Sequence, residues 1–276
     1  MCAFSSEETR RSPLSAARMA PRGLKATLKK GVPAKLVGTG KRRGFEVLRQ
    51  GQRTNVKLKG LTKRLQKKVW SSGDLPLVAR SSERRPGGHW GGPAGGRARG
   101  TRVDAQLTKI INGGPSAMKN VGHCYRLTKM ALSGLSQRGL EPVCAQRVVI
   151  SEKHRVGTAA DIICYSKRQN SIVIVELKCG FDHGRLAAAQ KDGRCCKMGA
   201  PLSRVADCNV HRHLAQLAVT WELFCRERCT LKRVGELGIE QTPTGLLMYV
   251  NDAGVEFFEL GEWWRNRASR LLGAIA

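Results

Sequence analysis

The chain has 276 residues, of which 41% are hydrophobic, so it is long enough to form a globular domain with a core. Its formal net charge of +28 favours an anionic partner, most often nucleic acid or else an anionic membrane surface. The sequence has neither an apolar signal core near its N-terminus nor a run of about 18 apolar residues. We therefore expect no secretory signal, no membrane span and reduced cysteines, of which there are ten.

The positive charge is concentrated in the first part of the chain. Residues 1–100 hold 24 Lys and Arg against 5 Asp and Glu, a net charge of +19, and the remaining residues carry +9. The same segment is rich in Gly and Ser and has few aromatic residues, a composition typical of disorder. The sequence therefore predicts a disordered basic arm over residues 1–115, with a Gly-rich linker at Arg85–Gly100 and a folded domain over residues 116–276.

The predicted elements of the folded domain follow from hydrophobic periodicity. A first helix begins at an N-cap, Ser116, and ends near Gly139. The next elements are a strand at Val143–Ile150, a hairpin of Asp161–Tyr165 and Ser171–Leu177, an irregular stretch Gly180–Asn209, a helix His211–Glu227, a second hairpin of Thr244–Val250 and Val255–Leu260, and a closing helix from Trp263. The order αβββαββα indicates an α+β domain with a central mixed sheet flanked by helices.

The first hairpin carries acids at one end only. If it turns at Arg168–Gln169, paired residues have numbers that sum to 337, which places Asp161 opposite Glu176 with Cβ atoms about 5 Å apart. Lys178 lies on the same side, two residues further along the strand. The positions between are almost all apolar, so both faces of the hairpin are expected to be covered.

Two carboxylates this close in a covered sheet favour a divalent cation between them, and oxygen ligands favour Mg²⁺ or Mn²⁺. We expect Asp161, Glu176 and the Leu177 carbonyl as ligands, with Lys178 orienting a water molecule. The pattern Asp…Glu-x-Lys at the ends of paired strands is similar to the core of PD-(D/E)XK nucleases, a restriction-endonuclease-like fold. The alternative is that these residues are solvated charges at strand ends.

Several separated blocks also resemble one family. GHCYRLTKMALSGL, RVVISEKHRVGTAADIICY, SIVIVELKCGFDHG and HLAQLAVTWELF occur in the order found in the unique-long-twenty-four family of herpesviruses. This resemblance implies a nuclear and virion protein with a PD-(D/E)XK endonuclease motif, linked to nucleolar changes and to host cell-cycle arrest at G2/M. It maps the motif onto Asp161, Glu176 and Lys178, and it adds Gln216 on the following helix. Ala160 and Thr220 stand where the motif more often has Pro and Tyr.

The resemblance implies a nuclear and nucleolar location, nucleic acid as partner (DNA or RNA), contacts with host nucleolar proteins, and no small-molecule cofactor. The alternative function is a non-catalytic nuclear or tegument module that binds nucleic acid or host proteins. Two further patterns stay open. Trp263 and Trp264 either stack on bases or pack against the second hairpin. One group of cysteines and histidines either forms a zinc site or consists of scattered side chains with reduced thiols: Cys195, Cys196, Cys208, His211 and His213.

Overall fold

The computed structural model describes residues 20–30, 34–37, 44–49, 52–71, 93–114, 117, 119–180, 190–191 and 194–276. The elements before the central hairpin are α1 (Leu24–Lys29), β1 (Ala34–Val37), β2 (Gly44–Arg49), β3 (Gln52–Gly60), α2 (Leu61–Lys68), α3 (Pro93–Gly113), η2 (Lys119–His123), α5 (Arg126–Gln137) and β4 (Leu140–Ser151). The others are β5 (Val156–Ser166), β6 (Ser171–Cys179), β7 (Gln190–Lys191), β8 (Arg194–Cys195), α6 (Asn209–Cys225), α7 (Arg228–Glu236), β9 (Glu240–Asn251), β10 (Gly254–Glu259) and α8 (Glu262–Ala274).

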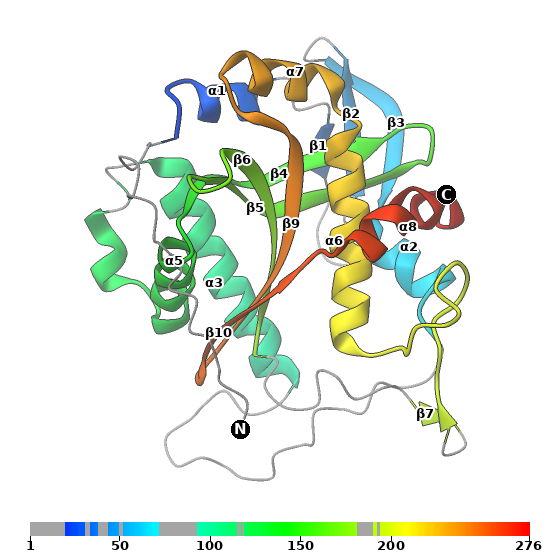
Figure 1. The fold of residues 1–276 in the computed structure, drawn as a ribbon. Coiled ribbons are helices and arrows are strands. Elements are labelled where there is room, and N and C mark those ends of the chain that lie inside the picture. Colours follow the sequence, from blue (N-terminus) through cyan, green and yellow to red (C-terminus); the bar gives the residue numbers. More distant parts are fainter. Residues whose placement is uncertain are drawn as a thin grey trace, which may run out of the picture.

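The centre of the molecule is a mixed sheet in the order β1-β2-β3-β5-β6-β9-β10, with β4 paired to β5 as well. The β3–β5 and β6–β9 pairs are parallel, and the other pairs are antiparallel. In Figure 1, α3 and α5 lie on one side of this sheet, and α6 lies on the other side with α8 beside it. The expected α+β architecture with a mixed sheet flanked by helices is confirmed.

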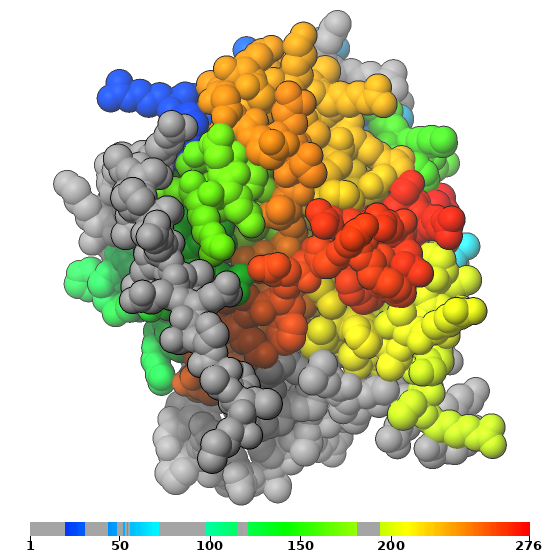
Figure 2. Space-filling model, in the orientation of Figure 1, coloured from blue at the N-terminus to red at the C-terminus, as the bar shows by residue number. Residues whose placement is uncertain are grey.

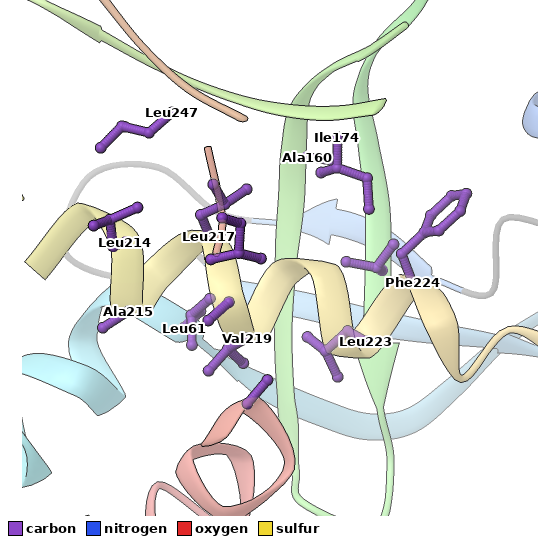
Figure 3. Packing of buried hydrophobic residues seen from close by; sticks show 14 of the residues in the cluster. Leu61, Ala160, Ile174, Leu214, Ala215, Leu217, Val219, Leu223, Phe224 and Leu247 are labelled. Carbon is purple, nitrogen blue, oxygen red and sulfur yellow. The ribbon is translucent and has the colours of Figure 1, made fainter. Parts of the chain in front are cut away.

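Two apolar clusters cover the two faces of the central hairpin. One face, with Ile163 and Ile174, packs against α1, α2, α6 and α8. Figure 3 shows Leu217 and Phe224 of α6 in this cluster. The other face, with Ile162 and Val175, packs against α3 and α5. Strands β5 and β6 are rich in β-branched residues because both of their faces are buried.

The hairpin register was predicted correctly. Ile162 pairs with Val175 and Ile163 pairs with Ile174, so the residue numbers sum to 337. The expected strands, the helix around residues 211–227 and the closing helix are also present, with shifted ends. The first helix differs, because it divides into η2 and α5; Gly139 follows α5 with φ 69°, and Ser116 lies outside the described residues.

The prediction of a disordered arm over residues 1–115 is wrong for the part of that segment that the structure describes. This part forms α1, β1, β2, β3, α2 and all of α3, and β3 extends the central sheet. The linker expected at Arg85–Gly100 is helical from Pro93 onward, while residues 85–92 lie outside the described part. Apolar residues at regular spacing, such as Leu61 and Leu65, give these basic elements a buried side.

Candidate active site at the end of the central hairpin

Asp161 lies where the regular alternation of β5 breaks. In a regular strand, residues two apart face the same side of the sheet. Ala160 and Ile162, on either side of Asp161, instead belong to the apolar clusters on opposite faces. On the neighbouring strand β4, Gln146 lies opposite Asp161 and has a φ of 56°. The residues on either side of Gln146 pair with the residues on either side of Asp161. Irregularities of this kind re-aim side chains in a sheet. Here the Asp161 carboxylate accepts hydrogen bonds from the Leu177 backbone N–H at 2.9 Å and from Gln146 Nε2 at 3.2 Å.

Glu176 lies on β6 and is only 1% exposed. Its Oε1 atom accepts hydrogen bonds from Lys178 Nζ at 2.5 Å and from Gln216 Nε2 at 2.6 Å. Its Oε2 atom is buried and has no hydrogen-bond partner among the residues that the structure describes. A buried carboxylate oxygen without a partner is costly, so this atom is a place where a cation would be favourable.

The charges of the site influence one another strongly. Burial and the Asp161 carboxylate together raise the pKa of Glu176 to about 8, against the opposing effect of Lys178. Burial acts to lower the pKa of Lys178, but Glu176 and Asp161 outweigh it, so that pKa is raised. Lys178 is therefore a permanently charged group beside two carboxyl groups. Perturbed pKa values of this kind are typical of functional sites.

Helix α6 supplies the third side of the site. Its Leu214, Leu217 and Ala218 are buried against the sheet, and this packing aims Gln216 at Glu176. One turn earlier, His213 Nδ1 contacts the Tyr249 hydroxyl at 2.7 Å. Burial lowers the pKa of His213 well below its usual value, and the charges of Lys178 and Arg212 lower it further. His213 is thus a neutral imidazole next to Lys178.

Sequence reasoning missed two polar residues of this site, Asp104 on α3 and Gln146 on β4. Gln146 Nε2 donates to Asp104 Oδ1 at 2.8 Å as well as to Asp161, so it links the two acids. The sequence carries a signal for α3, because its buried residues are spaced as on one helix face: Val103, Leu107, Ile110 and Ile111. Because the first residues of that helix are rich in glycine, the helical spacing was not recognised.

The four predicted site residues therefore come together at one place: Asp161 and Glu176 interact, and Lys178 and Gln216 both bond to Glu176. Two carboxylates and a backbone carbonyl are hard oxygen donors, which suit Mg²⁺ or Mn²⁺. The unpartnered Glu176 Oε2 fits such a cation. Asp104 lies one hydrogen-bonded residue away, and among the described residues it does not form with Asp161 and Glu176 a group of three acids arranged to hold a metal.

The zinc hypothesis finds no support in the described part of the chain, where no group of three or more His, Cys, Asp or Glu is arranged to hold a metal. His213 instead bonds to Tyr249. Cys208 pairs with His211, which raises the pKa of that histidine. The two tryptophans have different environments. Trp264 packs against the core, whereas Trp263 is 42% exposed and lies beneath the guanidinium of Arg267, whose Cζ is 3.8 Å from the ring centroid.

No family model, curated protein or solved structure matches this chain. Among the described helices, none is both long and apolar enough to cross a membrane. The function must therefore be argued from the geometry of the site and from the charge of the chain.

Proposed function

We propose that this chain is a metal-dependent nuclease of the PD-(D/E)XK type, which hydrolyses phosphodiester bonds of DNA or RNA with Mg²⁺ or Mn²⁺. One observation carries the proposal: Asp161 and a buried Glu176 with one unpartnered oxygen lie beside Lys178 at the end of a buried hairpin. Asp161, Glu176 and the Leu177 carbonyl would hold the cation. When bound, the cation lowers the pKa of a water ligand and neutralises phosphate charge.

The residues of the chain would divide the remaining work. The Leu177 N–H and Gln146 fix the orientation of Asp161 before any ligand arrives. Gln216 holds Glu176 Oε1, which leaves Oε2 available to the cation. Lys178, which bonds to Glu176 in the structure, would orient the attacking water and stabilise charge that develops on the phosphate.

The proposal extends to the biological setting through the resemblance of several sequence blocks to the unique-long-twenty-four family of herpesviruses. On that basis the protein would act in the host nucleus and nucleolus, would be carried in the virion, and would contribute to arrest of the host cell cycle at G2/M. The net charge of +28 supports nucleic acid as its partner, because phosphate contacts supply most of the non-specific affinity for nucleic acids.

A second candidate function is a nuclear module that binds nucleic acid or host proteins without catalysis. The observation in its favour is the short Lys178–Glu176 hydrogen bond, since a lysine and an amide already satisfy Glu176 Oε1 without a metal. In that case the acids would be a structural remnant, and the positive charge alone would determine binding.

Metal titration of the full chain separates the two functions. Truncation at residue 101 is unsuitable because it removes β3 and the start of α3. Mg²⁺ or Mn²⁺ should raise the unfolding midpoint of the wild type. At a metal concentration of about 100 times the dissociation constant, the free energy of unfolding should increase by about 2.7 kcal/mol. Labelled DNA and RNA strands should be cleaved only with metal.

The variant Glu176→Gln removes the buried charge with little change in shape. It should lose both the metal-dependent stabilisation and the cleavage, the latter by at least about 100-fold. Glu236→Gln, an exposed acid on α7, is the matched control and should behave as wild type. A wild type whose stability and activity do not respond to either metal would refute the nuclease and leave the binding module.

A further inference from the structure

Arg99 reaches the same end of the sheet as the candidate active site. It lies in the first half of α3, and its neighbour Gly100 lies against the side chain of Cys179 at the end of β6. The guanidinium covers Gly180, where an added Cβ would stand 2.7 Å from Arg99 Nη2. Gly180 is two residues beyond Lys178, so Arg99 lies at the same end of β6 as the proposed catalytic lysine.

The side chain of Arg99 is only 16% exposed, and its guanidinium has few partners among the residues that the structure describes. Its Nη1 atom forms an ion pair with Asp252 Oδ2 at 3.3 Å, and its buried Nε has no hydrogen-bond partner among the described residues. A guanidinium has five N–H donors in a planar fork that matches the oxygens of a phosphate. Within the described part of the chain, the Arg99 guanidinium therefore has donors left for a ligand.

Asp252 is well placed to be displaced by a ligand. It lies in the turn between β9 and β10, and its side chain is 46% exposed. The turn does not depend on that carboxylate, because Asn251 Oδ1 accepts the N–H groups of Ala253 and Gly254. A second arginine, Arg126 on α5, donates to the backbone carbonyl of Asp252 at 3.2 Å. Two arginines from different helices thus converge on one exposed turn.

A nuclease site with several carboxylates needs positive charge nearby to accept a polyanion. We propose that Arg99 binds a backbone phosphate of the nucleic-acid substrate, and that the Asp252 carboxylate occupies the place of that phosphate in the free protein. This proposal rests on the proposed function, because the phosphate would lie next to the one that is cleaved. Exchange of an aspartate for a phosphate retains the charge-assisted pairing and adds a second N–H contact.

The competing interpretation is that the Arg99–Asp252 pair only ties α3 to the turn. The two interpretations predict opposite effects of Asp252→Asn, which removes the carboxylate charge and retains the shape. If Asp252 competes with phosphate, the variant binds nucleic acid more tightly. If the pair is a tether, the variant has lower stability and unchanged or weaker binding.

The test is fluorescence anisotropy with labelled duplex DNA, single-stranded DNA and RNA, using the full chain in EDTA so that no hydrolysis occurs. Arg99→Ala should weaken binding by about 10-fold or more. It should also reduce the slope of log affinity against log salt by about one. Arg99→Lys, which retains the charge without the fork, should fall between Arg99→Ala and wild type. Asp252→Asn should bind more tightly than wild type.

The matched controls are Arg138→Ala and Glu259→Gln, because Arg138, which follows α5, and Glu259 on β10 form an exposed ion pair at 3.9 Å. Each changes the net charge by one unit and should alter affinity only a few-fold. Thermal unfolding of every variant checks folding. If Arg99→Ala does not fold, Arg99→Lys and Asp252→Asn still decide the question.

Three results would overturn the phosphate site: Arg99→Ala binds like Arg138→Ala, Asp252→Asn fails to tighten binding, or the wild type binds none of the three probes. Failure of the nuclease function has a different signature. In that case the wild type would not cleave with metal, while the effects of Arg99 and Asp252 on binding in EDTA would persist.

Discussion

At the scale of single residues, Asp207 is a second buried carboxylate, and its role is structural. It is 0% exposed and accepts hydrogen bonds from the backbone N–H and hydroxyl of Ser71, at 2.6 and 2.5 Å. Arg212 Nε and Nη2 donate to the same carboxylate. Asp207 therefore ties Ser71, which follows α2, to Arg212 in the first turn of α6.

The pH dependence of Asp207 gives a testable prediction. Burial acts to raise its pKa, but the hydrogen bonds from Arg212 and Ser71 outweigh it, so the pKa is lowered from 3.8. Its contribution to stability is therefore present above pH 3.8 and is lost as the pH falls through the lower pKa of the folded state. Asp207→Ala should cost about 3 kcal/mol at pH 7 in urea unfolding, and less in strong acid.

The control for Asp207 is Glu222→Ala, which removes an ion pair between Glu222 and Arg226 within α6. Such pairs contribute about 0.3–0.5 kcal/mol. A cost for Asp207→Ala as small as that of the control would contradict the structural role. So would a difference from wild type that stays constant down to strongly acidic pH.

The site shows which residues sequence reasoning can find. The turn alone predicted the register of the hairpin, and this register brings Asp161, Glu176 and Lys178 to the same end of the two strands. Gln216 was found through the resemblance, since nothing in the local pattern of α6 aims it at Glu176. Gln146 could not be found, because its position depends on its own backbone φ of 56°, and the sequence of β4 contains no pattern that predicts this irregularity.

At the scale of elements, the N-terminal helices and strands were missed because average composition conceals periodicity. In α2, the sequence LTKRLQKK is mostly basic, yet Leu61 and Leu65 are both buried. In β3, Leu58 is buried between two exposed lysines. α7 was missed because its short sequence RCTLKRVGE buries only Thr230 and Val234. Tertiary contacts across the sheet, absent from any local window, decide that these segments fold.

A substitution in α2 tests whether the N-terminal elements belong to the core. Leu65 is fully buried in the cluster that covers the α6 side of the sheet, so Leu65→Ala should lower the free energy of unfolding by about 2–5 kcal/mol. Lys67→Ala, an exposed position on the same helix, should change it by no more than about 0.5 kcal/mol. Equal effects of both variants in urea unfolding would show that α2 is detached from the core.

At the scale of the whole molecule, one apolar cluster joins the two ends of the described chain. It contains Leu24 of α1 and Leu272 of α8, together with residues of α2, α6 and the sheet. The buried Arg147 adds a polar link, because it bonds to the Leu28 carbonyl of α1 and to Glu227, which precedes α7. In Figure 2, α8 in red lies against α6 in yellow, so the last helix completes this layer.

This shared core predicts a single cooperative unfolding transition. All five tryptophans contribute to the fluorescence, and Trp70, Trp221 and Trp264 pack against this cluster. Fluorescence and far-ultraviolet circular dichroism, which reports on the backbone, should give the same midpoint in urea. Both curves should coincide because even the third apolar cluster, formed by Phe45, Val47 and Leu58 of β2 and β3, is completed by Val148 of β4 in the same sheet. Two midpoints, with fluorescence and circular dichroism disagreeing, would show that the N-terminal elements unfold independently.

The parallel pairing of β3 with β5 has a consequence for how the chain is made. Gly60 pairs with Gly157, so β3 leaves the ribosome long before the strand that it needs. Until β5 and β6 emerge, the nascent chain exposes an incomplete sheet edge and the apolar sides of α1 and α2. Such non-local pairing slows folding, and chaperones that bind exposed apolar segments would have their longest opportunity during this interval.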